Sequence, residues 1–321
     1  MCKILSLIIP VYNVEAYIEE CINSIILQLD NRIEVIIVND GTPDNSMKII
    51  EHCLEGLPKK LQDCFIILNQ ENQGQSCARN TALDIAKGEY IGFIDSDDFV
   101  DKNYVIKLFN IINGSQPDII SIKGKRFIDI ANDQKSNFEM QLLDKVGLHE
   151  LNFNLKTKIF NRHHWFIWSY IIKKSLIKDN AFIPKIYFED AIFVSSLIIR
   201  AKNIYFSNEF LYYYRINCNG SLLSISSANI QKNMDSYNFV INYFYNKIKS
   251  NSLYSVSYII SLQSYLSYLR DKRNISYIIM EYYKFKDFDK CVDKKTIINK
   301  GNLLFYKLGV IFIIFLYATR K

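Results

Sequence analysis

Glycine and proline are scarce in this chain of 321 residues, with 11 and 5 copies respectively. Their scarcity excludes collagen-like, linker-rich and low-complexity proteins, because those classes depend on one or both residue types. Hydrophobic residues make up 49% of the chain and charged residues 22%, which is the balance of a folded globular protein. At roughly 150 residues per domain, the length predicts about two domains.

The sequence also shows no paired cysteines and no long apolar run, and we do not expect its first residues to be a leader peptide. Its seven cysteines form no CxxC pair, so we interpret them as reduced, buried thiols rather than zinc ligands or disulfides. Reduced thiols favour a cytosolic compartment. The apolar start at residues 1–10 is too short for a signal peptide and has no small-residue cleavage site. Lys307 interrupts the apolar run Leu303–Ala318, which is shorter than the ~18–20 residues that span a bilayer.

The net charge of +6 hides an uneven distribution. Residues 1–120 carry a net charge of −9, whereas residues 121–321 carry +15. Such asymmetry fits two parts with different partners. The acidic first part argues against nucleic acid as the partner of the whole chain.

The first half alternates short apolar strands with amphipathic helices. Strands are predicted at residues 4–9, 33–38, 64–68 and 89–94, and helices at about 14–29, after Thr42-Pro43-Asp44, and at 76–87. Asn13 is the expected N-cap of the first helix. This order predicts an α/β fold with a Rossmann-like, mostly parallel sheet flanked by helices. Ligands of such sheets bind beyond the carboxyl ends of the strands, so the residues that follow each strand should meet in one crevice.

Three carboxylates, on Asp95, Asp97 and Asp98, follow the fourth strand directly. Carboxylates this close repel each other unless a cation lies between them, and Mg²⁺ uses one or two carboxylates together with substrate phosphates. The alternative is a solvated acidic turn that caps the next helix. Neither GxGxxG nor GxxxxGK[ST] occurs, which disfavours a dinucleotide dehydrogenase and a P-loop protein. Asp40 and Tyr12 are placed to bind and stack on a nucleotide base.

Four segments of this half resemble the motifs of family 2 glycosyltransferases. They are LSLIIPVYNVE at residues 5–15, VNDGTPDNS at 38–46, NQGQSCARN at 72–80 and GEYIGFIDSDD at 88–98. Each motif is moderately specific, and four in the right order are very specific. The resemblance implies the GT-A fold and the transfer of a sugar from a nucleotide donor with inversion at the anomeric carbon.

The resemblance also implies roles for the residues at the strand ends. The donor-binding residues would be Pro10, Val11, Tyr12, Glu15, Asp40, Gly74, Arg79, Asn80, Asp95, Ser96 and Asp97. Asp95-Ser96-Asp97 resembles the DxD motif, in which Asp97 or the following Asp98 would bind Mg²⁺ or Mn²⁺ at the diphosphate. The remaining acids would contact ribose or the donor sugar. The ion would neutralise charge that develops on the leaving nucleoside diphosphate, and a UDP-sugar is the favoured donor.

An inverting transfer needs a base that accepts the proton of the acceptor hydroxyl. Glu189-Asp190 resembles the ED motif of the family, so Asp190 is predicted as the base, and Glu189 either as its support or as an acceptor-binding residue. The alternative is a pair of acids favoured by the first turn of a helix. Arg215 and Ser221 resemble a loop that closes over the diphosphate, unless Arg215 is simply exposed on a strand. Trp168 is predicted either to stack on an acceptor sugar or to be a buried core residue.

The second half predicts an acceptor-side region followed by a helical extension. We expect a GT-A domain at residues 1–225, with a donor part at 1–120 and an acceptor part at 121–225, and a helical C-terminal extension at 226–321. The basic, apolar tail at residues 302–321 favours peripheral contact with the cytoplasmic face of the inner membrane. Packing of this tail on the protein core or on a homodimer partner is the alternative.

The sequence as a whole predicts an inverting, metal-dependent, hexosyl-type glycosyltransferase of cell-surface polysaccharide synthesis, acting on a saccharide or lipid-linked saccharide acceptor. A sugar-nucleotide pyrophosphorylase is disfavoured because residues 10–13 form no Gly-rich loop. A processive synthase is disfavoured because no QxxRW motif is present. The remaining alternative is a non-catalytic nucleotide-sugar- or glycan-binding relative. Loss of Asp97 or Asp190 would mark such a relative, and both are present.

Overall fold

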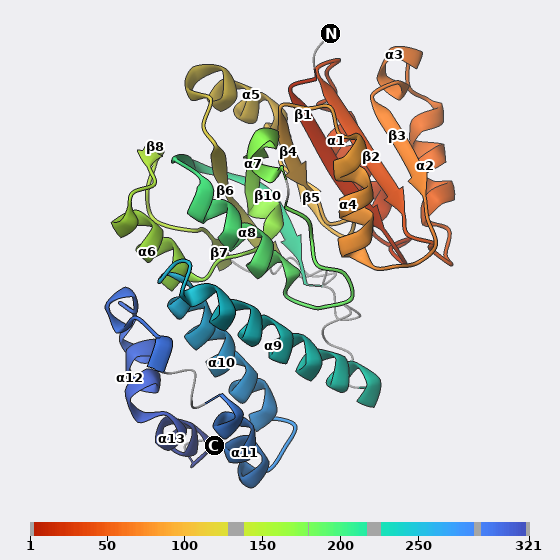
Figure 1. Ribbon diagram of the computed structural model, residues 1–321. Coiled ribbons are helices and arrows are strands. Elements are labelled where there is room, and N and C mark those ends of the chain that lie inside the picture. The colour runs from red at the N-terminus through yellow and green to blue at the C-terminus, as the bar shows by residue number, and fades with distance from the viewer. Residues whose placement is uncertain (1–2, 128–137, 179, 217–225, 286–289, 319–321) are drawn as a thin grey trace. The chain divides into compact units, whose positions relative to one another are not determined.

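A computed structural model describes residues 3–127, 138–178, 180–216, 226–285 and 290–318 of the chain. The chain divides into two compact units (Figure 1). Unit 1 comprises residues 1–151, 165–185 and 189–220, and unit 2 comprises residues 152–164, 186–188 and 221–321. Two segments from the middle of the sequence therefore belong to the same unit as the C-terminal helices.

Within the described residues, unit 1 contains a ten-stranded sheet that begins with four parallel strands. These are β1 (Leu5–Val11), β2 (Ile33–Asn39), β3 (Phe65–Asn69) and β4 (Tyr90–Phe93), arranged in the order β3-β2-β1-β4. Leu7, Ile8 and Ile37 are fully buried. Strands covered on both faces read as continuous apolar runs, which is why the sequence revealed them. The predicted strands and their parallel pairing are confirmed.

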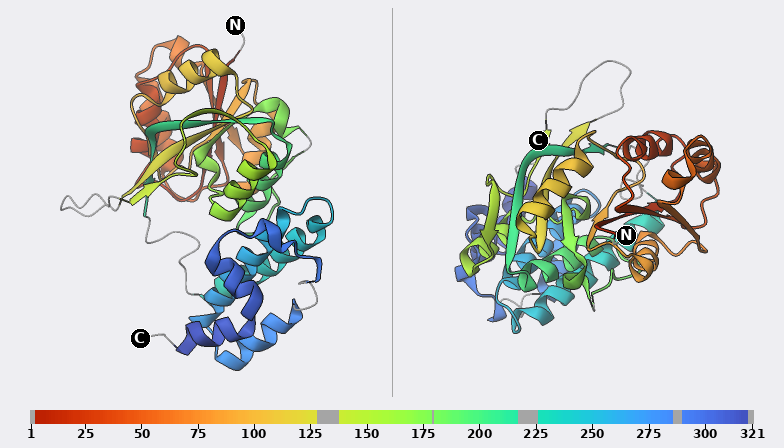
Figure 2. Two further views of the ribbon diagram at one scale, coloured as in Figure 1. Left: turned by 90° about the vertical axis from the view of Figure 1, so that its left-hand side faces the viewer. Right: turned by 90° about the horizontal axis from the view of Figure 1, so that it is seen from above.

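Helices cover both faces of this parallel part of the sheet (Figure 2). They are α1 (Ile18–Ile26), α2 (Ser46–Glu55), α4 (Gln75–Ile85) and α5 (Tyr104–Ser115), whereas the short α3 (Lys59–Gln62) buries no residue. Leu7 and Ile9 share one core cluster with Ile18 and Ile22 of α1, whereas α4 packs on β1 and β2. Successive side chains of a strand point to opposite faces, so β1 is buried by different helices on its two sides.

The start of α1 differs from the prediction. The helix begins at Ile18 with Tyr17 at its N-cap, so Asn13 is not the capping residue. Asn13 instead has a φ of 54°, and its backbone N–H donates to the hydroxyl of Thr42 at 2.8 Å. Asparagine tolerates this left-handed conformation better than most residues, and here it turns the chain sharply after β1.

The remaining strands make the sheet mixed. They are β5 (Phe99–Val100), β6 (Ile119–Phe127), β7 (Phe138–Met140), β8 (Gly147–Glu150), β9 (Tyr170–Lys173) and β10 (Asn203–Arg215). β9 runs antiparallel to both β4 and β6, β10 runs parallel to β6, and β5 pairs antiparallel with β10. Unit 1 also contains η1 (Ile167–Ser169), α7 (Lys174–Ile177) and α8 (Glu189–Arg200). The β10–β5 pair lies directly after the acidic turn and therefore brings distant residues to it.

Unit 2 is helical in the residues described. Its elements are α6 (Phe153–Arg162), α9 (Ser227–Ile248), α10 (Tyr254–Arg270), α11 (Ile275–Lys284), η3 (Lys294–Thr296), α12 (Lys300–Leu308) and α13 (Val310–Ala318). Gly309, with a φ of 53°, separates α12 from α13, so the apolar run of the tail is not one continuous helix. The described residues contain no helix with the length and apolar character needed to cross a bilayer.

Candidate functional site

The carboxyl ends of the four parallel strands lie along one edge of the sheet. Val11 at the end of β1 pairs with Asn39 of β2, which in turn pairs with Asn69 of β3. Just beyond β4, the backbone N–H of Ile94 donates to the carbonyl of Ile8 in β1 at 3.0 Å. The polar segments that follow these strands therefore gather at this edge, where open parallel sheets bind their ligands.

Asp40, which follows β2, holds the loop that leads into α4. Its carboxylate is buried and accepts hydrogen bonds from the side-chain amide of Gln70 at 2.7 Å and from the backbone N–H groups of Gln73 at 2.9 Å and Gly74 at 2.8 Å. Gly74 has a φ of 87°, a conformation that glycine adopts without steric cost. Asp40 thus fixes the shape of this loop, a role that the sequence did not reveal.

The segment after β1 combines buried and exposed residues. Pro10 and Val11 are buried, whereas the Tyr12 side chain is 47% exposed and presents a free ring at the edge of the sheet. The carboxylate of Glu15 accepts hydrogen bonds from the backbone and the side-chain amide of Asn45, at 2.9 and 3.1 Å. Glu15 thereby ties this segment to the start of α2.

A buried arginine joins acids from two distant parts of the chain. Arg79 on α4 is 2% exposed, and its guanidinium nitrogens lie 2.9 Å from Asp95 Oδ1, 2.9 Å from Glu189 Oε1 and 3.1 Å from Asp190 Oδ1. Gln75, one turn earlier on α4, donates to the same Glu189 oxygen at 2.7 Å. The guanidinium of Arg79 therefore links the acidic segment after β4 to the first turn of α8.

Burial raises the pKa of Asp190 above its ordinary value; Arg79 opposes this rise, and the neighbouring Glu189 and Asp95 reinforce it. The backbone N–H of Ile167 donates to Asp190 Oδ2 at 3.2 Å and favours the charged form. Burial likewise raises the pKa of Glu189, again against the effect of Arg79. The Asp190 side chain remains 25% exposed, against 3% for Glu189, so Asp190 is the acid that a substrate can reach.

The three aspartates after β4 have different surroundings. Asp98 is 1% exposed and accepts hydrogen bonds from the Tyr212 hydroxyl at 2.8 Å and from the backbone N–H of Arg215 at 2.7 Å. Burial, with Asp95 and Asp97 nearby, raises the pKa of Asp98 well above its ordinary value. Asp95 is held by Arg79, and Asp97 is half-buried. Of the two aspartates predicted as metal ligands, Asp97 is therefore the more accessible.

A divalent ion fits this edge only together with a substrate. Within the described residues, no group of three or more His, Cys, Asp and Glu side chains is arranged to hold an ion. Mg²⁺ sites in enzymes often consist of one or two carboxylates completed by water and substrate phosphates. The half-buried carboxylate of Asp97 suits that kind of site better than the carboxylate of Asp98, which is 1% exposed.

Arg215 is not exposed on its strand. Its side chain is 4% exposed, and its guanidinium pairs with Glu20 and lies over the rings of Tyr17 at 4.9 Å and Phe127 at 4.6 Å. Its role beside the diphosphate stays a prediction. Ser221, the other predicted residue of this loop, lies outside the described residues.

Trp168 is a core residue. It is 1% exposed, and its ring stacks on the ring of Tyr212 with a centroid distance of 4.4 Å and an interplanar angle of 10°. A Cβ atom at Gly124 would lie 2.5 Å from the Trp168 ring, which shows how closely β6 packs against it. This burial supports the core alternative.

Asn80 acts as a connector between segments. Its side-chain amide donates to the carbonyl of Phe182 and accepts from the N–H of the same residue, both at 2.9 Å. This pair of bonds fastens α4 to the chain before α8. Ser96 is buried within the acidic turn. If Asn80 and Ser96 contact a donor as predicted, Asn80 does so while keeping its bonds to Phe182, and Ser96 does so from within the acidic turn.

Three further residues shape the site although the sequence analysis gave them no role: Gln70, Gln75 and Tyr212. Gln75 lies four residues before Arg79, a spacing that puts both on one face of a helix, and this spacing was the available signal. Gln70 and Tyr212 carried no local signal. Tyr212 reaches the acidic turn only because β10 pairs with β5, a contact between residues more than 100 positions apart.

The mixed sheet, the acids gathered beyond the end of β4 and the flanking helices have the arrangement of a class of protein, the GT-A glycosyltransferases. The crystal structure of S. aureus TarS 1-349 in complex with UDP-GlcNAc aligns with a TM-score of 0.72 at 20% identity, covering 98% of this chain and 89% of that chain. The mannosyltransferase PcManGT from Pyrobaculum calidifontis, in complex with GDP-Man and Mn²⁺, aligns with a TM-score of 0.52 at 12% identity and covers 99% and 87%. These similarities confirm the predicted fold.

The chain belongs to glycosyl transferase family 2, whose profile matches residues 6–174. The uncharacterized glycosyltransferase EpsJ of Bacillus subtilis is 36% identical over 225 residues, which are 68% of this chain and 63% of EpsJ. The poly(ribitol-phosphate) beta-glucosyltransferase of Bacillus spizizenii is 30% identical over 232 residues, which are 69% of this chain and 34% of that enzyme. The match thus spans less than two thirds of either relative.

Proposed function

We propose that this protein is an inverting glycosyltransferase that moves a hexosyl-type sugar from a nucleotide-diphosphate donor to a saccharide or lipid-linked saccharide in cell-surface polysaccharide synthesis. The observation that carries the proposal is Arg79, which holds Asp95 on one side and Glu189 and Asp190 on the other within about 3 Å. A donor-side acid and a base must face one reacting centre in such a transfer. Membership of family 2 supports the transfer of a sugar.

In the proposed reaction Asp190 is the base. The acceptor oxygen forms a bond to the anomeric carbon, its proton passes to Asp190, and the bond between that carbon and the diphosphate breaks. A raised pKa makes the Asp190 carboxylate a better proton acceptor, and its partial exposure lets an acceptor hydroxyl approach. Glu189 and Arg79 act through Asp190 as positioning residues, because both are buried against it.

The proposed donor is a UDP-sugar bound along the strand ends. Pro10, Val11, Tyr12 and Glu15 would line the nucleoside, with the exposed ring of Tyr12 stacking on the base. Asp40 would contact the base beyond the loop that it already holds. The support for uridine is that TarS has been crystallised with UDP-GlcNAc and with UDP.

We place the contact with Mg²⁺ or Mn²⁺ on Asp97, and the ion, when bound, would neutralise charge that develops on the diphosphate. We expect Asp97→Ala to abolish the gain in donor affinity that Mn²⁺ gives the wild type. Mutating a residue that only orients a metal ligand typically lowers metal affinity by roughly 10–100-fold. Removing the ligand itself should lower it by at least as much. Calorimetric titration with UDP-GlcNAc, with and without Mn²⁺, measures the loss. Asp63→Ala, which removes an exposed acid of the same unit, is the control. An unchanged Mn²⁺ effect in Asp97→Ala would refute the assignment.

The activity itself is tested with a panel of nucleotide sugars and saccharide acceptors. Mass spectrometry of the products shows which donor is consumed, and NMR of the new glycosidic bond shows whether the anomeric configuration is inverted. Inversion is the expected result, and retention would contradict the proposed single displacement. Donor binding without release of a nucleoside diphosphate from any pair would favour the non-catalytic alternative.

We also propose that the protein works in the cytoplasm, in peripheral contact with the inner membrane. Five free cysteines among the described residues support the compartment. A surface on α12 and α13, here called the tail surface, supports the contact. It consists of Leu304, Leu308, Ile311, Ile314 and Phe315, which are 41–63% exposed. Between residues 290 and 315 the chain has five lysines and one acid, a charge suited to anionic headgroups.

Replacing Ile311 and Phe315 together by serine should weaken binding to phosphatidylglycerol vesicles by at least about tenfold, since burying one such side chain contributes ~1.5–3 kcal/mol. Vesicle co-sedimentation measures the loss. The matched control replaces Leu27 and Ile106, two exposed apolar residues of unit 1, by serine. If the wild type does not bind vesicles and the Ile311/Phe315 variant changes only the mass of the particle in light scattering, the tail surface is a homodimer contact instead.

A further inference from the structure

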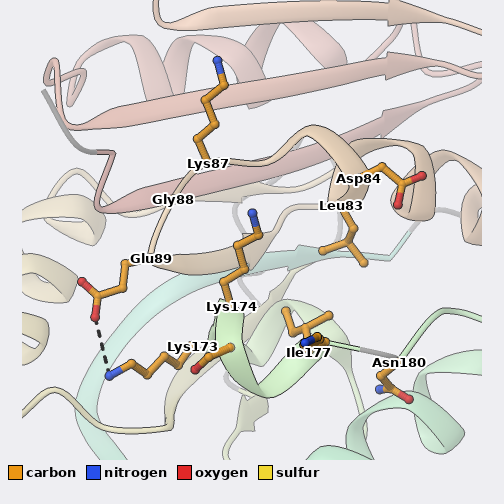
Figure 3. Close-up of a pocket in the computed structure, with 11 residues that line it drawn as sticks. Leu83, Asp84, Lys87, Gly88, Glu89, Lys173, Lys174, Ile177 and Asn180 are labelled. Atoms are coloured by element: carbon orange, nitrogen blue, oxygen red, sulfur yellow. Dashed lines mark ion pairs between the residues drawn. The ribbon is translucent and has the colours of Figure 1, made fainter.

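A pocket of unit 1 lies at the opposite edge of the sheet from the candidate active site. Its walls are the connection from α4 to β4 and the segment from β9 to α7 (Figure 3). Glu89 directly precedes β4 and Lys173 ends the antiparallel β9, whereas the acidic turn follows the other end of β4. The four residues of β4, at about 3.3 Å each, separate the two places by roughly 13 Å. The cavity measures about 530 Å³, within the roughly 300–1,000 Å³ of small-molecule sites.

The pocket has an excess of positive charge. Four lysines and two acids line it, which leaves a surplus of two positive charges; they are Lys87, Lys173, Lys174, Lys178, Asp84 and Glu89. Protein groups already engage part of this set. Lys173 pairs with Glu89 at 3.6 Å, and the ammonium group of Lys174 donates to the carbonyl of Ala86. If these lysines served only to pair with the carbonyls at the C-terminus of α4, each ammonium group would have a protein partner, as that of Lys174 has.

Lys87 and Lys178 are not engaged. Both are exposed, and within the described residues neither ammonium group has a hydrogen bond or an ion pair. The wall that carries Lys87 is fixed, because the N–H of the next residue, Gly88, donates to the hydroxyl of Ser6 at 2.8 Å. A Cβ atom at Gly88 would lie 2.4 Å from the backbone nitrogen of Ser6, so the chain approaches β1 closely here.

We propose that this pocket binds a phosphate group, either of a soluble phosphate or phosphate ester or of a lipid headgroup. Lysine binds phosphate as a mobile point charge, and Lys87 and Lys178 supply two such charges without breaking an existing contact. Leu83 and Ile177 line the same cavity and could contact the organic part of a phosphate ester. The inference is independent of the proposed transferase activity, because it uses none of the residues of that site.

The test compares the wild type with a Lys87→Glu/Lys178→Glu double variant in calorimetric titrations. Two probes are used separately: inorganic phosphate, and a water-soluble short-chain phosphatidylglycerol below its micellar concentration. The control, Lys60→Glu/Lys102→Glu, makes the same change of charge at two exposed lysines of unit 1 outside the pocket. Tryptophan fluorescence checks that unit 1 remains folded, because both tryptophans, Trp165 and Trp168, lie in it.

We expect the affinity for at least one probe to fall tenfold or more in the pocket variant and to change less than twofold in the control. Loss of phosphate binding alone identifies a soluble source, loss of lipid binding alone identifies a headgroup, and loss of both identifies the phosphate group itself. The proposal is overturned if the wild type binds neither probe. It is also overturned if the pocket variant keeps its affinity for both, or if the control loses as much.

Discussion

Asp190→Asn should lower kcat by about 10²–10⁴-fold, the contribution that a positioned general base makes. The replacement keeps the size of the side chain and an oxygen that can accept the Ile167 N–H, which now bonds Asp190 Oδ2 at 3.2 Å. It removes the carboxylate that takes the acceptor proton. Donor affinity should stay within about twofold of the wild type, because the donor is assigned to the strand ends. Steady-state kinetics and calorimetric donor titration measure the two quantities.

The pH profile distinguishes a base from a structural acid. Burial raises the pKa of Asp190, and only the deprotonated form accepts a proton, so kcat/KM of the wild type should rise with pH. The midpoint of this rise should lie above the ordinary aspartate pKa of about 3.9. Asp190→Asn should lack this limb, whereas Asp84→Asn, on the exposed end of α4, should keep it. An Asp190→Asn enzyme with normal turnover would refute the role of Asp190.

Arg79→Met should destabilise unit 1 by about 3–5 kcal/mol, the usual cost of removing one partner from a buried ion pair. Methionine fills much of the space of the arginine stem but leaves Asp95, Glu189 and Asp190 without their shared cation. Activity should also be lost, because the two acidic segments are then free to separate. Arg79→Lys should retain only part of the stability and of the activity, since one ammonium group cannot bridge three carboxylates as a guanidinium does.

Urea unfolding followed by tryptophan fluorescence measures this effect in unit 1, where both tryptophans lie. The control Arg32→Met removes an arginine that is 41% exposed and paired with Asp30, and should cost at most about 1 kcal/mol. The difference between Arg79→Met and the wild type should shrink as the pH falls, because protonated acids need no cation. Adding Glu189→Gln to Arg79→Met should recover part of the stability. Equal midpoints for Arg79→Met and Arg32→Met would contradict the role given to Arg79.

The sequence predicted the parts of the site that depend on local pattern. β1 to β4 are apolar on both faces, so a run such as residues 33–38 could be read directly as a buried strand. Because parallel strands end at the same edge of a sheet, the sequence alone predicted that Asp40 and Asp95 lie at that edge. The ends of α1 were harder to predict, because a positive φ at Asn13 delays the helix by several residues.

The sequence did not predict the contacts that depend on tertiary packing. Arg79 was assigned to the nucleotide side, and nothing local shows that its guanidinium would reach Glu189, 110 residues away. The burial of Trp168 and of Arg215 likewise results from β10, whose residues 203–215 pair with three segments of unit 1. A charge or an aromatic ring reads the same in a sequence whether it is exposed or enclosed, so only packing decides between the alternatives.

The interleaving of the two units limits how relatives of this protein can be recombined. Residues 186–188 belong to unit 2 yet immediately precede Glu189 and Asp190. The hydroxyl of Tyr187 donates to Asn229 of α9 at 2.7 Å, and Phe160 of α6 packs on Tyr254 of α10 at 6.0 Å between ring centroids. A chimaera with a single crossover near residue 225 would therefore separate these partners. A chimaera that exchanges the helical unit intact has to carry residues 152–164 and 186–188 with it, so the helices of unit 2 and the residues that precede Glu189 and Asp190 are inherited together.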